Sequence, residues 1–136
     1  MEKEKITEAE RRALVRARTQ TLLVRRLSEQ LRRESPDGLH SIVPDGMPRA
    51  RGGMAHGLDA QLAKREALQR MAARESALMR EYEREARSAM DRMGPEDYAF
   101  CALYYLAALS ISEVAEALDR SERQCLRYKR RIEGEE

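Results

Sequence analysis

Residues 110–132, SISEVAEALDRSERQCLRYKRRI, contain the pattern that decides the expected fold. Ser110 and Glu113 have the three-residue spacing of a capping box, in which a hydroxyl and a carboxylate bond free amides at a helix start. An apolar stripe with helical spacing follows and stops at Asp119. Ser121 can cap a second helix directly after this break. Two short helices joined by a tight turn are typical of a helix-turn-helix.

The second of these helices is expected to have an apolar face and a basic face. Three- and four-residue spacing places Cys125, Tyr128 and Ile132 on one face. Arginines occupy the centre of the opposite face, and guanidinium groups can bind guanine edges or phosphates, while glutamine can pair with adenine. A solvated basic face on an ordinary helical hairpin is the alternative. The predicted DNA contacts are Arg120, Ser121, Arg123, Gln124, Arg127, Arg130 and Arg131.

A basic amphipathic helix is predicted within residues 1–34. Thr7 and Glu10 have the spacing of its capping box. Eight arginines and one acid, Glu29, lie between positions 11 and 33. We expect this arginine stripe to contact DNA phosphate or an acidic partner, with a solvated outer face as an equal alternative. Four of its members recur every seven residues: Arg11, Arg18, Arg25 and Arg32.

The middle of the chain predicts a connector followed by a second long helix. Residues 35–58 hold three of the four prolines and five of the seven glycines, a composition that breaks helices. Asp59 is expected to cap an amphipathic helix over residues 59–93, which the Gly94-Pro95 pair ends. The expected fold is therefore all-α, with two long helices, the connector and a three-helix unit over residues 94–136. The two long helices are expected to form an antiparallel hairpin or to meet another copy, and helix 95–109 to pack its excess apolar surface on the long helix or on a second copy. A homodimer through the long helices and helix 95–109 is therefore predicted.

Composition and motifs exclude several classes of protein. The two cysteines lie in apolar helical patterns and are expected to be reduced, and the polar beginning of the chain does not resemble a secretory signal. No apolar run is long enough for a membrane span, so we expect a cytoplasmic protein. His40 and His56 lie in the connector without other metal ligands at suitable spacing. Neither catalysis, a metal nor a cofactor is expected.

Residues 98–132, and especially ISEVAEALDRSERQCLRYKRRI, resemble the sigma-70 region 4 type of helix-turn-helix. The whole layout is similar to small phage-encoded late transcription regulators, with VPDGMPRARGG as the spacer. Such a resemblance implies a sequence-specific DNA-binding regulator in a bacterial host cell, with RNA polymerase as a further partner. This motif usually has glycine at its turn, whereas Asp119 and Arg120 stand here; aspartate tolerates the left-handed conformation better than most residues.

Two other interpretations stay open. A DNA-packaging protein resembling a small terminase subunit would also combine a helix-turn-helix with oligomerising helices, but would form a ring. A protein-interaction module would bind RNA polymerase through the same surface in place of DNA. Solution mass distinguishes the first from a dimeric regulator, and salt-sensitive retention on DNA distinguishes the second.

Overall fold

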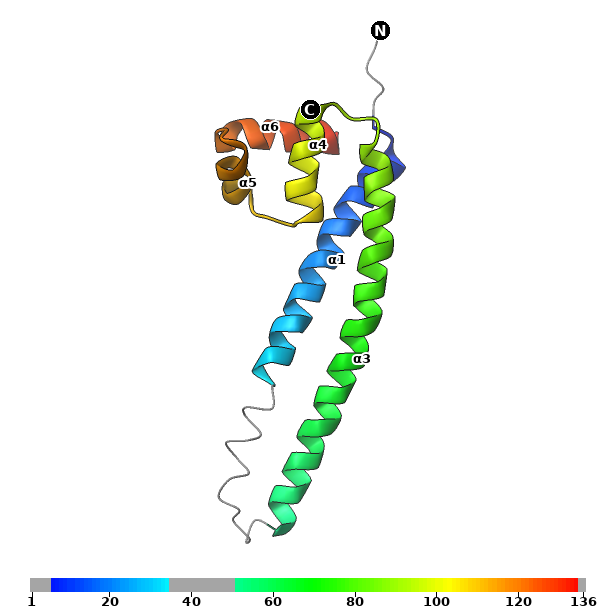
Figure 1. Cartoon of the computed structure of the whole chain (residues 1–136), viewed down its shortest axis with the longest axis vertical. Helices are drawn as coiled ribbons and strands as arrows, with labels where there is room; N and C mark the ends of the chain where they lie inside the picture. Colours follow the sequence, from blue (N-terminus) through cyan, green and yellow to red (C-terminus); the bar gives the residue numbers. More distant parts are fainter. Residues whose placement is uncertain (1–5, 35–50, 135–136) are drawn as a thin grey trace. The chain divides into compact units, whose positions relative to one another are not determined.

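The computed structural model describes residues 6–34 and 51–134, and it is all-α there, as predicted (Figure 1). The chain divides into two compact units: a first unit of residues 1–22 and 77–136, and a second unit of residues 23–76. The first unit therefore takes residues from both ends of the chain. In order, the elements are α1 (Glu8–Arg33), α3 (Arg51–Met90), α4 (Pro95–Cys101), the π-helical turn η2 (Ala102–Leu106), α5 (Ile111–Leu118) and α6 (Glu122–Glu133).

Helix α1 begins at the predicted capping box. The Thr7 amide donates to Glu10 Oε1 at 3.0 Å, and the Glu10 amide donates to Thr7 Oγ1 at 3.1 Å. The Thr7 amide, together with the Arg92 guanidinium, holds the pKa of the Glu10 carboxyl below its usual value. These bonds satisfy amides that have no partner within the helix, so the start of α1 is fixed locally by its sequence.

Helix α3 begins earlier than predicted. It starts at Arg51, so the helix includes residues 51–58, which the sequence had assigned to the connector, and Asp59 lies inside it. Glycine costs about 1 kcal/mol in a helix but keeps its amide, so it weakens the backbone ladder without breaking it as proline would. The remaining connector residues, 35–50, lie outside the described residues. At the other end, α3 stops at Met90, three residues before the predicted limit.

The core of the first unit joins both ends of the chain. Leu14 and Ala17 of α1 pack with Ala86 and Met90 of α3, and all four are buried. Helices α4, α5 and α6 complete this core beside the start of α1 and the end of α3 (Figure 1). The apolar residues contributed by the segment 95–109 include Phe100, Cys101, Tyr104 and Tyr105.

Part of the apolar surface of segment 95–109, which was expected to pack on the long helix or on another copy, is buried within the chain's own core. Tyr98 of this segment remains 41% exposed. The segment is also not one regular helix. The Ala107 amide donates to Ala102 O, five residues back, and Ala108 has a left-handed φ of 57°. The π-helical turn η2 shifts the register of the last turn, and Tyr104 and Tyr105 are both buried in the structure.

The second unit combines the end of α1 with the start of α3. Leu27 is buried there, and Lys64 forms an ion pair with Glu34 at 3.3 Å. Three of its large apolar side chains are exposed: Leu23, Leu62 and Met71. Leu27 is the only buried apolar side chain among the described residues of this unit, so its core is small.

Candidate nucleic-acid interface

Helices α5 and α6 form the predicted hairpin, and the first of them begins at the predicted cap. The Glu113 amide donates to Ser110 Oγ at 3.2 Å, and the Ser110 amide donates to Glu113 Oε1 at 2.9 Å. Val114 and Ala115 are buried, as their spacing predicted. The capping box and the apolar stripe together fix where α5 begins and which face it turns to the core.

Asp119 closes the turn between the two helices in the left-handed conformation. Its φ is 57° and its ψ is 47°. The Arg120 amide donates to Ala115 O at 3.0 Å, and the Asp119 amide donates to Glu116 O at 3.3 Å. This pair of bonds is a Schellman motif, which usually has glycine at the left-handed position. The expectation that aspartate can replace that glycine is confirmed.

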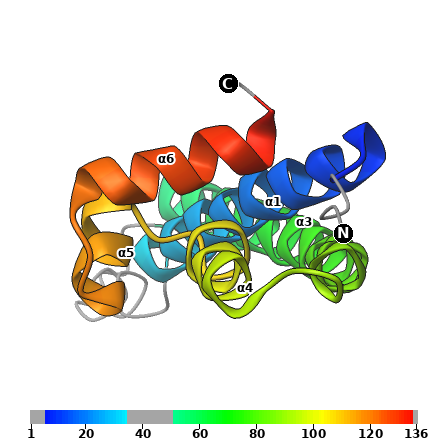
Figure 2. The ribbon, with the colours of Figure 1, turned by 90° about the horizontal axis from the view of Figure 1, so that it is seen from above.

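Helix α6 is attached to the unit through the predicted apolar face. Cys125 and Ile132 are buried, and Tyr128 is half-buried with its ring 5.7 Å from that of Phe100. Ser121 begins the helix with a second capping box, because the Gln124 amide donates to Ser121 Oγ at 3.1 Å. The helix runs past α4 to the first turns of α1 (Figure 2).

The outer face of α6 carries three exposed arginines: Arg123, Arg127 and Arg130. Within residues 6–34 and 51–134, none of the three makes an ion pair or a side-chain hydrogen bond. Leu126 lies beside them with 39% of its surface exposed. We call the three arginines, Arg123, Arg127 and Arg130, the arginine face. Because no carboxylate of the described segments pairs with them, they are available to an external anion.

The other four predicted DNA contacts are already engaged within the chain. Arg131 Nη2 lies 2.5 Å from Asp97 Oδ1, and Arg120 Nη2 lies 3.6 Å from Glu96 Oε2. Ser121 and Gln124 bond each other's amides in the capping box, and Gln124 Oε1 accepts from the Ser121 amide at 3.1 Å. Of the seven predicted DNA contacts, the three central arginines thus have no ion pair among the described residues, whereas the other four already bond to groups of the chain.

Three residues support this surface in a way that the sequence did not predict. The Tyr105 hydroxyl donates to Glu133 Oε2 at 2.5 Å, and burial, followed by this carboxylate, raises the pKa of Tyr105. The Arg11 guanidinium packs against Gly134 at the end of α6, where an added Cβ would lie 2.9 Å from Arg11 Cζ. Both contacts join residues far apart in sequence, so no local pattern indicates them.

Arg18, a member of the arginine stripe, is the third of these residues. Arg18 Nη1 donates to Tyr104 O at 2.6 Å and to Leu109 O at 2.8 Å, and Arg18 Cζ lies 3.9 Å from the centre of the Tyr104 ring. The side chain therefore satisfies one carbonyl in η2 and one just before α5, and stacks on the Tyr104 ring.

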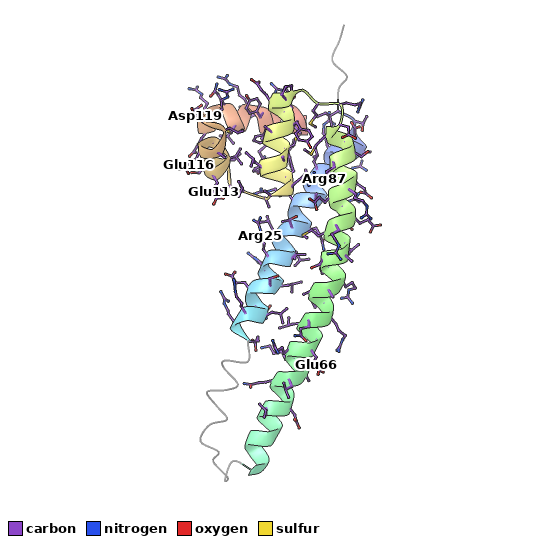
Figure 3. All side chains as sticks on the ribbon, viewed as in Figure 1. Arg25, Glu66, Arg87, Glu113, Glu116 and Asp119 are labelled. Atoms are coloured by element: carbon purple, nitrogen blue, oxygen red, sulfur yellow. The ribbon has the colours of Figure 1, made fainter. Side chains whose placement is uncertain are left out.

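The two helices of the hairpin differ in charge. Glu113 and Glu116 lie on α5 and Asp119 follows in the turn (Figure 3), whereas α6 carries the arginine face. A polyanion is repelled by the first helix and attracted by the second, so the surface favours approach to α6.

Other kinds of site are not found in the part of the chain that the structure describes. No group of three or more His, Cys, Asp or Glu side chains there could hold a metal ion. No helix among the described residues combines the length and apolar content needed to cross a membrane. No protein-family model, curated protein or solved structure matches the chain.

Proposed function

We propose that the protein binds duplex DNA through α6, as a sequence-specific transcriptional regulator of the phage type. The observation that carries the proposal is the arginine face: three exposed guanidinium groups on one side of the second helix of a capped hairpin, without intramolecular counter-charges among the described residues. Guanidinium groups suit both phosphate oxygens and the guanine edge in the major groove.

The spacing of these residues fits a groove. Arg123 and Arg130 are seven residues apart, which in an α-helix corresponds to about 10 Å along the axis. That length matches about three base pairs at about 3.4 Å each. Arg127, between them, is expected to lie nearest the base edges, while the other two reach bases or phosphates according to the tilt of the helix.

The test is a fluorescence anisotropy titration with labelled duplex DNA. Arg127→Ala is expected to weaken binding at least several-fold at moderate salt, because it removes the arginine expected nearest the base edges. Arg84→Ala is the matched control, because Arg84 is an exposed arginine of α3 in the same unit. Equal losses from both variants, or no loss from Arg127→Ala, contradict the proposal.

We also propose that two copies act together, since one short helix contacts too little DNA for tight specific binding. The exposed Leu62 and Met71 of α3 support pairing through the second unit. Solution mass tests this: a dimer is expected, whereas a monomer contradicts it. An eight- to tenfold ring would favour the packaging function over the regulator.

A further inference from the structure

We propose that Asp97 and Glu96 set how many phosphates the α6 surface neutralises, by holding Arg131 and Arg120 in ion pairs that compete with DNA. The inference rests on the proposed DNA binding and deepens it. It assigns a specificity-determining role to two carboxylates that do not themselves contact the nucleic acid. Both belong to the first turn of α4, where the positive end of the helix dipole favours a negative charge.

The stronger of the two pairs is between α6 and α4. Arg131 Nη2 lies 2.5 Å from Asp97 Oδ1, and the guanidinium also lies over the Tyr128 ring at 5.3 Å. The Asp97 side chain is 23% exposed, whereas that of Arg131 is 52% exposed. The acid is thus the more buried partner. About half of the arginine side chain remains exposed, so a phosphate that binds it would compete with the carboxylate for the guanidinium.

The second pair closes the other end of the same surface. Arg120, in the turn before α6, lies 3.6 Å from Glu96, and the Tyr128 hydroxyl donates to Glu96 Oε1 at 3.3 Å. Glu96 and Asp97 are adjacent, yet they reach arginines before the start of α6 and in its last turn. Two carboxylates therefore flank the arginine face from the α4 side.

This arrangement has an electrostatic consequence for DNA binding. An arginine paired with a carboxylate presents almost no net charge to a distant phosphate, and the carboxylate repels a nearby one. The salt dependence of binding reports the number of phosphates neutralised. Five arginines lie between positions 120 and 131, but two of them are paired with carboxylates. In the salt dependence of DNA binding, the hairpin should therefore behave as a surface with three uncompensated arginines. Weakened phosphate binding leaves a larger share of the affinity to base contacts.

The experiment is a salt titration of duplex binding by Asp97→Asn, which keeps the shape of the side chain and removes its charge. Arg131 then becomes available for one more phosphate. The slope of log K against log salt should become steeper by about 0.9, and binding should tighten by up to about eightfold at 0.1 M monovalent salt. Asp91→Asn is the matched control, as it removes the same charge from an exposed aspartate in the same unit. It should change neither quantity appreciably.

A double-mutant cycle with Arg131→Gln identifies the cause of the change. In the Arg131→Gln background, Asp97→Asn should no longer tighten binding, because the arginine that it releases is gone. Weaker or unchanged binding by Asp97→Asn with an unchanged slope overturns the inference, as does a gain that persists without Arg131. A wild-type protein that does not bind duplex DNA overturns the proposed function itself. Normal wild-type binding with an inert Asp97→Asn overturns only the competition.

Discussion

Replacing Arg18 by methionine tests how strongly α1 supports the hairpin. Arg18 makes two charged hydrogen bonds, to Tyr104 O and Leu109 O, and a cation–π contact at 3.9 Å, all part-buried. A hydrogen bond to a charged group contributes about 1.5–3 kcal/mol, and a cation–π contact about 0.5–2 kcal/mol. These contributions are not additive, so we expect a loss of about 3 kcal/mol in the free energy of unfolding.

Urea denaturation followed by tyrosine fluorescence measures this loss. All five tyrosines belong to residues 77–136, so the signal reports the first unit alone. A loss of about 3 kcal/mol should lower the urea midpoint by about 2 M, for a slope of about 1.5 kcal/mol per M. Methionine retains most of the aliphatic volume, which separates the lost polar contacts from a packing defect.

Arg16→Met is the matched control for Arg18. Arg16 also combines an ion pair, at 2.5 Å from Glu85, with a cation–π contact, at 4.6 Å from the Tyr82 ring centre. Its side chain and that of Glu85 are 50% and 48% exposed, however, so we expect a loss of only about 0.5–1 kcal/mol. If Arg18→Met costs no more than Arg16→Met, the proposed support of the hairpin by α1 is refuted.

Three further predictions concern the hairpin and its core. Asp119→Ala should destabilise the first unit by about 1 kcal/mol relative to Asp119→Gly in thermal melts, because alanine is strained at a left-handed position and glycine is not; equal melting temperatures would refute the strain argument. Ser121→Ala should cost about 1 kcal/mol and expose the first amides of α6 to faster hydrogen exchange; unchanged exchange there would contradict the cap. Burial raises the pKa of the Cys101 thiol to about 12, so the unfolded thiol ionises first as pH rises. Stability present below about pH 9 should therefore fall by up to about 1.4 kcal/mol per pH unit between 9 and 12, and Cys101→Ala should flatten that fall; an identical slope in the variant would exclude the thiol as its source.

Local sequence patterns predicted the helix boundaries that side chains determine. Ser110, Asp119 and Ser121 each act within a few residues of themselves, through caps whose partners are adjacent in the chain. The predicted start of α3 was wrong because no capping pattern marks the observed start at Arg51. Its first turn contains no acidic residue, and the glycines that suggested a loop are tolerated within a 40-residue helix.

Long-range contacts determine which arginines have a partner within the chain, and a single sequence does not show these contacts. Arg18 and Arg123 are both arginines on predicted helix faces, yet one bonds carbonyls 86 and 91 residues away, while the other has no such partner within the described residues. The flanking Arg131 bonds a carboxylate 34 residues earlier. A single sequence gives the type and periodicity of a charged residue. The location of its counter-charge depends on the fold. The seven predicted DNA contacts could therefore be narrowed to the three residues of the arginine face only with the structure.

The discontinuous first unit constrains when the protein can fold during its synthesis. Leu14 and Ala17 leave the ribosome early, but Ala86 and Phe100, which share their core, are made about 70 to 85 residues later. At about 5–20 residues per second this gap lasts several seconds. During that time the apolar face of α1 has no native cover from the first unit. We expect the nascent chain to depend on a chaperone, or on the charges around that face, to stay unaggregated until α6 emerges.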